Sequence, residues 1–266
     1  MADEFASLFR LRVQYVKRGR LRYLSHLEIL RACERVVMRA GLPFALSQGF
    51  SPRMRIAFGP ALPVGVSSDD EWFDLVMTEL VPSADALGLL RGAAVDDLMP
   101  QRASYVGMRE PSLSAALTIA QWSCEVFACD EFGARVPSPT ELAPAIGAAF
   151  DEVLSAGEIR YLRNGKDKVV SLENKVARAP EVTSGASDGS ARVSFSTRSS
   201  NEGALRPDVL MRAVMDRCES IPTAGRDGGT ARMGAVVSSS GIRLRASINR
   251  DAQQIESEDG TWHRPI

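Results

Sequence analysis

Arginine residues spaced for anion binding stand out near the start of the chain. Arg31, Arg35 and Arg39 recur at every fourth position, so a helix would place them along one face. Guanidinium groups can bind phosphate or carboxylate oxygens through two parallel hydrogen bonds. A row of this kind is also common on ordinary solvated helix faces. The spacing alone leaves both interpretations open.

A second basic group adjoins a segment rich in glycine and proline, residues 47–65. Arg53 and Arg55 alternate with apolar residues in a predicted strand, which puts the two arginines on one face. Glycine and proline fix the backbone shape around that strand. Together the two groups predict a surface that binds RNA or a protein partner, in which Phe50 or Tyr23 can stack on an unpaired base. The candidate binding residues are Lys17, Arg18, Arg20, Arg22, Ser25, His26, Arg31, Arg35, Arg39, Ser47, Gln48, Gly49, Phe50, Ser51, Pro52, Arg53 and Arg55.

The net charge of −1 conceals an uneven distribution of charged residues. Residues 1–60 contain eleven Lys or Arg against four Asp or Glu, and residues 61–100 contain one against eight. One interpretation is that the fold neutralises this dipole internally. The other is a basic face that meets an anionic partner such as RNA.

His26 is a weak candidate for a catalytic residue. It follows Ser25 at a predicted helix start and lies close in sequence to Lys17 and Arg20. A metal-independent endoribonuclease of the CRISPR-repeat-processing type has a similar outline, with a histidine on a helix as general acid or base. A histidine in the first turn of a capped helix more often completes local hydrogen bonding.

The sequence predicts no metal site and no cofactor. It has two histidines and four scattered cysteines without a CxxC pair, which is typical of free thiols in a reducing compartment. It also lacks a phosphate-binding GxxxxGK loop. No apolar run approaches the roughly 18 residues of a membrane span, and the chain starts with acidic residues. We therefore expect a cytoplasmic protein without a membrane partner.

The element pattern predicts an α+β fold with two tandem ferredoxin-like (βαββαβ) domains, each with an antiparallel sheet. In the first domain, residues 8–109, Ser25 and Glu28 form a predicted capping box at the start of a helix. We expect the buried stripe of that helix to contain Leu27, Leu30, Cys33, Val37 and Ala40. The other predicted elements are strands 9–17, 53–58, 71–77 and 102–108 and a helix over 83–90.

The second predicted domain covers residues 116–250. A hairpin is expected around Asn164-Gly165, a dipeptide that accepts positive φ. Residues 183–190 are predicted to be a flexible loop, and residues 251–266 a disordered tail. The other predicted elements are strands 118–128, 191–197 and 242–248 and helices 138–156 and 207–217.

Four motifs in the first domain together resemble a bacterial family. They are the segments Tyr15–Gly19, Leu24–Glu28, Arg39–Pro43 and Gly49–Pro52, the last continuing to Gly65. This combination is similar to the radical-SAM-associated domain of unknown function. The resemblance implies a companion of a radical SAM enzyme that carries a cobalamin-binding-type domain, with genes near those for ribonuclease E/G and ribosomal proteins. The chain lacks three closely spaced cysteines for an iron-sulfur cluster, so it is not itself such an enzyme.

We therefore expect an accessory binding protein that works with a radical SAM enzyme and presents tRNA or rRNA for modification or maturation. One alternative is the endoribonuclease that uses His26. The other is a protein-interaction scaffold without RNA binding, whose surface Trp72 and Asp74 could join.

Overall fold

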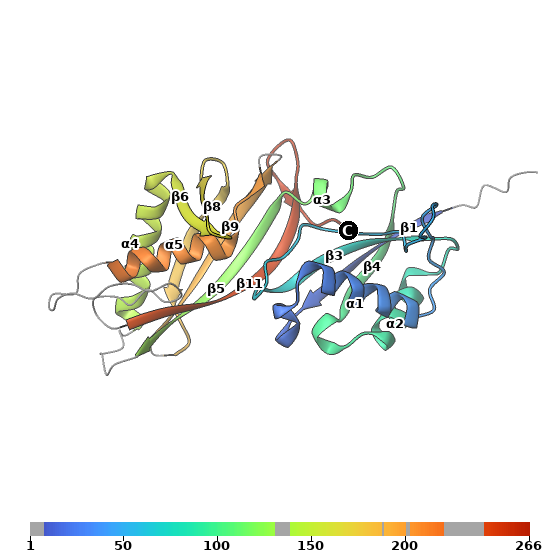
Figure 1. The fold of residues 1–266 in the computed structure, drawn as a ribbon, viewed down its shortest axis with the longest axis horizontal. Coiled ribbons are helices and arrows are strands. Elements are labelled where there is room, and N and C mark those ends of the chain that lie inside the picture. Colours follow the sequence, from blue (N-terminus) through green and yellow to red (C-terminus); the bar gives the residue numbers. More distant parts are fainter. Residues whose placement is uncertain (1–7, 131–138, 188, 201–202, 221–241) are drawn as a thin grey trace, which may run out of the picture. The chain divides into compact units, whose positions relative to one another are not determined.

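The chain has a mixed α+β structure that divides into two units. The computed structural model describes residues 8–130, 139–187, 189–200, 203–220 and 242–266. These residues contain five α-helices and mostly antiparallel strands (Figure 1). The first unit comprises residues 1–118 and 250–266, and the second comprises residues 119–249. In the described part, no helix is long and apolar enough to cross a membrane.

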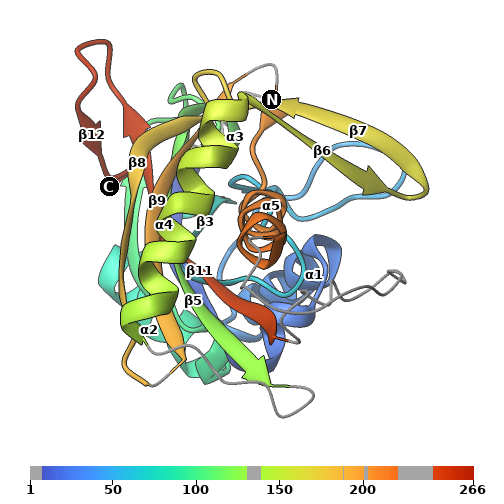
Figure 2. The ribbon, with the colours of Figure 1, turned by 90° about the vertical axis from the view of Figure 1, so that its left-hand side faces the viewer.

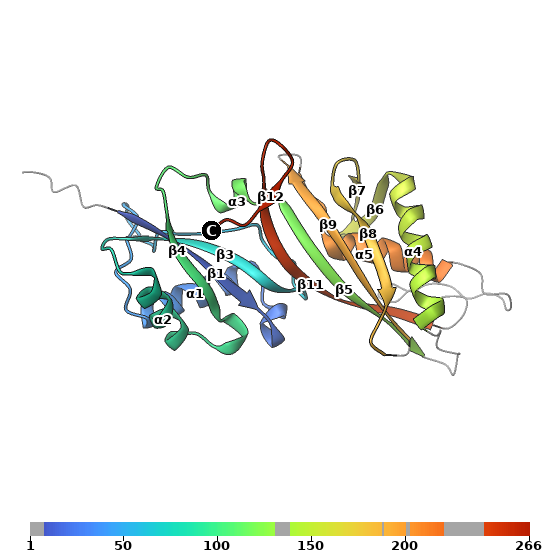
Figure 3. The ribbon, with the colours of Figure 1, turned by 180° about the vertical axis from the view of Figure 1, so that it is seen from behind.

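The first unit is built on an antiparallel sheet with the strand order β2-β3-β1-β4. Helices α1 and α2 cover one face of this sheet (Figure 1), and the opposite face is visible in Figure 3. Two 3-10 turns, Gly19–Tyr23 and Asp96–Leu98, connect elements of this unit. The elements are β1 (Phe9–Lys17), α1 (His26–Arg39), β2 (Ile56–Phe58), β3 (Ser67–Met77), α2 (Ser83–Ala93), β4 (Pro100–Val106) and α3 (Leu113–Ala116).

The capping box predicted for α1 is confirmed. The Glu28 amide donates to Ser25 Oγ at 3.4 Å, and the Ser25 amide donates to Glu28 Oε2 at 2.8 Å. These bonds satisfy amide groups that a helix N-terminus leaves without partners. The Ser25 hydroxyl also donates to Glu28 Oε2 at 2.7 Å, and this bond, together with that from the Ser25 amide, lowers the pKa of Glu28 by stabilising its charged form.

The buried stripe of α1 differs from the prediction at its first turn. Leu27 is 64% exposed, whereas Ile29 is buried. Cys33 and Val37 are buried as expected, and Val36 joins them. Ile29 packs in the core that α1 shares with β1 and β3, with Leu24 against the same cluster. This staple across the N-cap turns the helix so that Leu27 faces outward.

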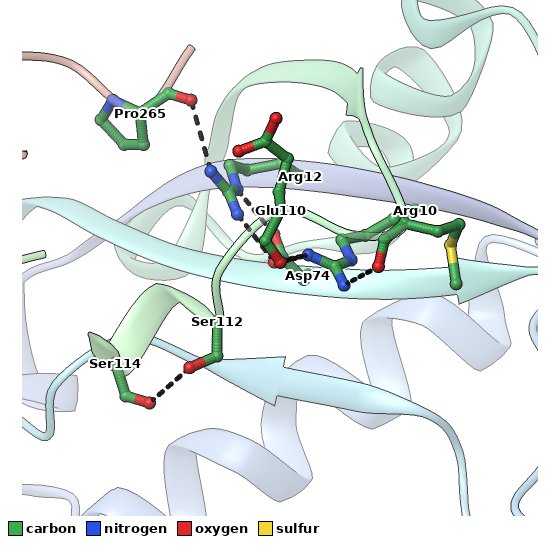
Figure 4. A network of polar contacts seen from close by, with 8 residues as sticks. Arg10, Arg12, Asp74, Glu110, Ser112, Ser114 and Pro265 are labelled. Atoms are coloured by element: carbon green, nitrogen blue, oxygen red, sulfur yellow. Dashed lines mark hydrogen bonds and ion pairs between the residues drawn. The ribbon is translucent and has the colours of Figure 1, made fainter. Parts of the chain in front are cut away.

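The face of the sheet opposite α1 and α2 is also buried. Arg12 and Gln14 are almost fully buried, because the C-terminal segment lies over this face. Arg12 Nη1 donates to the Pro265 carbonyl oxygen at 3.4 Å (Figure 4). Both Gln253 nitrogens donate to Asp70. The tail predicted to be disordered is therefore structured. Its strands are β11 (Ile242–Glu256), of which residues from 250 onward belong to the first unit, and β12 (Trp262–His263).

The second unit contains a sheet with the strand order β8-β9-β5-β11, with α4 and α5 on one face (Figures 1 and 3). A separate two-stranded hairpin, β6–β7, stands apart from this sheet (Figure 2). The elements are β5 (Ile119–Asp130), α4 (Pro139–Ala156), β6 (Glu158–Arg163), β7 (Lys166–Ser171), β8 (Val176–Ser184), β9 (Ser190–Ser200), β10 (Gly203–Ala204) and α5 (Pro207–Ser220).

The residue types typical of turns predicted one hairpin of the second unit correctly, but they did not predict a second hairpin. Asn164 and Gly165 have φ of 52° and 71°, which confirms the predicted turn between β6 and β7. Residues 183–190 were predicted to be a flexible loop. Instead β8 continues to Ser184, and the Gly185 amide donates to the Ser190 carbonyl oxygen at 3.0 Å. The serines and glycines of this segment therefore belong to a tight connection between β8 and β9.

Candidate nucleic-acid interface

The outer surface of α1 combines basic and apolar side chains. We define the α1 outer face as Leu27, Arg31, Arg35, Met38 and Arg39, all of which are exposed. Arg35 and Arg39 make no side-chain hydrogen bond or ion pair with any described residue. Arg31 interacts only electrostatically with Glu28, whose pKa it helps to lower. Three guanidinium groups are thus available to a ligand along about 12 Å of helix, at 1.5 Å per residue.

The segment before α1 adds an aromatic side chain that is held by an arginine. Arg22 lies over the Tyr23 ring with its guanidinium carbon 4.9 Å from the ring centre, and its Nη2 donates to the Tyr23 hydroxyl at 2.9 Å. The Arg22 carbonyl accepts the Gly65 amide at 2.8 Å. Tyr23 is 59% exposed and can therefore present its ring to a partner. Arg20 is also exposed.

Residues 47–53 form a closed loop with an exposed aromatic side chain. The Ser47 amide donates to the Arg53 carbonyl at 2.8 Å, and the Arg53 amide donates to Ser47 Oγ at 3.0 Å. Ser47 therefore shapes the loop, and Gln48 to Pro52 are all exposed between the two ends. The Phe50 ring is fully exposed, which is unusual for a side chain of this size.

Arg53 and Arg55 are exposed as predicted, but they do not join the α1 outer face. Met54, Ile56 and Phe58 pack against the core that lies beneath α1. Because side chains alternate along an extended segment, Arg55 points to the opposite face of the sheet. The predicted residues therefore fall into two surfaces, one on α1 and one beside the edge strand β2.

Lys17 and Arg18 are not free to bind a partner. Lys17 is 2% exposed, and its Nζ donates to the Leu24 carbonyl at 3.1 Å. Burial lowers the pKa of Lys17, an effect that the nearby Glu71 partly opposes. Arg18 is exposed but paired with Asp69 at 2.7 Å. The prediction that Lys17 belongs to a binding surface is wrong, because β1 continues beneath the turn that follows it.

Ser25 and His26 have structural partners within the first unit. Ser25 is the N-cap of α1, which occupies its hydroxyl. The His26 ring packs edge-on against Phe58, with the ring centres 5.9 Å apart and an interplanar angle of 87°. The His26 ring makes no hydrogen bond or ion pair with a described residue. The local role of this histidine is therefore to join the start of α1 to β2.

The acidic segment after Ala61 neutralises part of the basic charge, but not that of α1. Arg12 binds both oxygens of Asp74, at 2.8 and 2.9 Å, and Arg250 binds Glu71 at 2.9 Å (Figure 4 shows the Arg12 pair). All four residues are buried. Burial raises the pKa of Glu71, and Arg250 opposes this rise. The internal-dipole interpretation therefore holds between β1 and β3, where Asp74 neutralises Arg12, whereas Glu71 pairs with an arginine from outside the basic segment.

Two further residues that were considered for a partner surface lie inside the first unit. Trp72 is 1% exposed and packs with Leu113 and Leu117, while Asp74 is occupied by Arg12. Conversely, Leu27 and Met38 belong to the exposed surface and were missed. A periodicity count could have found them, because residues 27, 31 and 38 fall within one narrow arc at 3.6 residues per turn. In the described ranges, no group of His, Cys, Asp or Glu side chains is arranged to hold a metal ion.

The fold and surface define a two-unit α+β protein with an exposed basic helix. The chain matches, over residues 10–207, the family described as "Uncharacterized protein conserved in bacteria (DUF2344)". It therefore belongs to that family. The match carries no link to radical SAM enzymes, so that association stays a prediction.

No curated protein matches the sequence. The chain is similar to a solved structure described as "Crystal Structure of an Unknown Protein from Galdieria sulphuraria" at 8% identity. That likeness covers 91% of this chain and 99% of the other, with a TM-score of 0.24. At this TM-score it carries no argument about fold or function.

Proposed function

We propose that the first unit is an RNA-binding module that presents tRNA or rRNA to a partner enzyme. The observation that carries the proposal is the α1 outer face, on which Arg31, Arg35 and Arg39 are exposed and make no ion pair within the described residues. A guanidinium group that serves stability usually has an acidic partner, as Arg12 has in Asp74. Arginines without one are candidates for an external anion.

The chemistry of the surface favours RNA over a simple anion. Successive arginines on α1 are about 6 Å apart along the axis, so one strand can supply a phosphate to each. The exposed Tyr23 ring, in the segment before α1, offers a face on which an unpaired base can stack, the usual mode of single-strand recognition. The exposed Phe50 ring offers a second such face in the loop beside β2. Leu27 and Met38 add apolar contact between the arginines.

We also propose that each unit is a ferredoxin-like domain. In the first unit this fold would support α1 on an antiparallel sheet. The strand order β4-β1-β3-β2 with two helices on one face supports this for the first unit. The order β11-β5-β9-β8 supports it for the second, with β6–β7 as an insertion. The fold alone does not indicate an activity.

The partner in this proposal is a radical SAM enzyme, and the setting is RNA modification or maturation in the cytoplasm. This part follows from the resemblance of the motifs around Gly49 to Gly65 and at the start of α1. The chain would act as the binding subunit, because it carries no cluster-binding cysteine motif.

A protein-interaction scaffold is the second candidate, and the mixture of Leu27 and Met38 with arginines favours it. Such a surface would dock on an acidic patch of the partner enzyme. Co-purification of the tagged chain with the enzyme, with and without nuclease, separates the two functions. Retention after nuclease treatment that requires Arg35 would favour the scaffold.

RNA binding is tested directly by fluorescence anisotropy with labelled bacterial tRNA and an rRNA hairpin at about 50 mM salt, where phosphate contacts are strongest. We expect the double variant Arg31→Gln/Arg35→Gln to bind more weakly than the native chain. The matched control is Arg102→Gln/Arg109→Gln, which removes the same charge from other exposed sites of the first unit. Undetectable binding by the native chain, or equal losses in both variants, would contradict the proposal.

A further inference from the structure

The second unit contains a cavity that no part of the proposed RNA surface uses. Its volume is about 710 Å3, and it lies between the β6–β7 hairpin and α5, which Figure 2 shows beside each other. Small-molecule sites commonly measure about 300 to 1,000 Å3. Ile159 and Val209, both buried, line the cavity from the hairpin and the helix. The cavity therefore has an apolar portion and the size of a ligand site.

Polar and aromatic side chains of β6 and α5 line this space. Tyr161 and Arg163 follow Ile159 at alternate positions of β6, so the three share one face of the hairpin. On α5, Arg212 and Asp216 follow Val209 by three and seven residues, which places them on one helix face. The cavity lining thus contains an aromatic ring, four guanidinium groups and three carboxyl groups, among them Tyr161, Arg163, Arg212 and Asp216.

Two of the cavity's arginines are already neutralised and two are not. Arg206 binds both oxygens of Asp208, at 3.0 and 2.8 Å, and Arg160 pairs with Glu158 at 2.8 Å. Arg163 makes no side-chain hydrogen bond or ion pair within the described residues. Arg212 makes no hydrogen bond there either, although it interacts electrostatically with Asp216. Arg163 and Arg212 are therefore the cations that a ligand can use.

A bare anion would fit this lining poorly. Asp167 and Asp216 also line the cavity and would repel it, and the apolar portion at Ile159 and Val209 would stay unfilled. A suitable ligand needs an anionic group for the arginines, hydrogen-bond donors for the carboxyl groups and a planar body for Tyr161. Burial raises the pKa of Asp216, so this carboxyl group lies in a partly desolvated position suited to specific hydrogen bonding.

We propose that the cavity binds a nucleoside monophosphate, either free or as an unpaired nucleotide of an RNA. The phosphate contacts Arg163 and Arg212, the base packs against Tyr161, and an amino group of the base donates to Asp216 or Asp167. The cavity is formed within the second unit, so the proposal does not depend on RNA binding by the α1 outer face.

Calorimetric titration of the full chain with AMP, GMP, CMP and UMP, and separately with inorganic phosphate, tests the proposal. At least one nucleotide should bind, with an affinity at least about tenfold above that of phosphate. The double variant Arg163→Ala/Arg212→Ala should lose about tenfold or more, because two charge-assisted contacts disappear. Tyr161→Leu should weaken nucleotide binding while preserving apolar volume, and circular dichroism should show that both variants fold.

Two controls keep the outcome unambiguous. Arg192→Ala removes an exposed arginine of the second unit outside the cavity and should leave affinity unchanged. Arg31→Gln/Arg35→Gln should also retain nucleotide binding, so failure of this proposal and failure of the RNA proposal are distinguishable. If a short single-stranded RNA binds more tightly than any mononucleotide, and this binding depends on Arg163, the ligand is a nucleotide of an RNA. If the RNA binds more weakly, the ligand is a free nucleotide. No nucleotide binding up to about 1 mM, equal binding of phosphate, or full affinity in the double variant would overturn the proposal.

Discussion

The basic residues of the first unit form two sets that differ in their surroundings. The strand set, Arg12 and Lys17 on β1 with Arg250 on β11, is buried. The helix set, Arg31, Arg35 and Arg39 on α1, is exposed and makes no ion pair with a described residue. A basic side chain that pairs with a carboxylate and is covered by another segment contributes to stability. A basic side chain that has neither is available for binding.

The largest effect should follow from breaking a pair of the strand set. Arg12→Ala leaves the buried Asp74 carboxylate without its bidentate partner. Removing one member of a buried ion pair costs about 3 to 5 kcal/mol of unfolding free energy. Urea unfolding measures this loss. A change below about 1 kcal/mol would mean that Arg12 and Asp74 do not form a buried ion pair, and the difference between the two sets would disappear.

The two faces of α1 should also differ in their response to alkaline pH. Burial raises the pKa of the Cys33 thiol above its ordinary value of 9.0, so the folded chain keeps a proton that the unfolded chain loses. The folded state then binds more protons, and stability falls as pH rises above 9, by at most about 1.4 kcal/mol per pH unit.

The difference in unfolding free energy between the native chain and Cys33→Ala, measured from pH 7 to 10.5, isolates this contribution. It should be constant at lower pH and shrink above pH 9. If the difference in unfolding free energy stayed constant across the whole pH range, the thiol would titrate in the folded state as it does in the unfolded state. The Cys33 face of α1 would then be accessible to water.

A smaller loss is expected at the start of α1, which positions the helix set. Ser25→Ala removes the N-cap hydroxyl and should lower the unfolding free energy by about 1 kcal/mol. Ser51→Ala, in the exposed loop, is the matched control and should change stability by less than about 0.5 kcal/mol. Thermal unfolding of the two variants compares them directly. Equal effects would show that the capping box does not fix α1.

The smallest stability effect should come from the helix set itself. Arg35→Ala should change the unfolding free energy by less than about 0.5 kcal/mol, because its side chain is exposed. The same urea unfolding used for Arg12→Ala measures it. A loss comparable to that of Arg12→Ala would assign Arg35 to stability and remove the difference between the two sets.

Local signals predicted the elements that position the site. Alternation identified β1, the Ser25 and Glu28 pattern placed the start of α1, and Asn164-Gly165 placed the β6–β7 turn. Each depends on residues close together in sequence, where propensity and turn chemistry act directly. The exposure of Arg31, Arg35 and Arg39 followed from their spacing alone.

Long-range contacts explain what the sequence could not predict. Arg12 contacts Pro265, in the segment 251–266 whose polar composition indicated disorder. Glu71 pairs with Arg250, which the sequence assigned to the second domain. Lys17 looked like a surface residue because a charged turn follows it, yet its Nζ reaches the Leu24 carbonyl. The local sequence around Arg12 therefore could not predict that a segment more than 200 residues away covers it.

Phosphate binding by the helix set is central to the proposed function of the first unit. Its direct test is the slope of log affinity for RNA against log salt, for the native chain and for Arg31→Gln/Arg35→Gln/Arg39→Gln. Each lost phosphate contact should reduce the slope by about 0.7 to 0.9, so the triple variant should lose about 2 to 3, with stability unchanged. An unchanged slope, or a native chain that shows no RNA binding at about 50 mM salt, would contradict it.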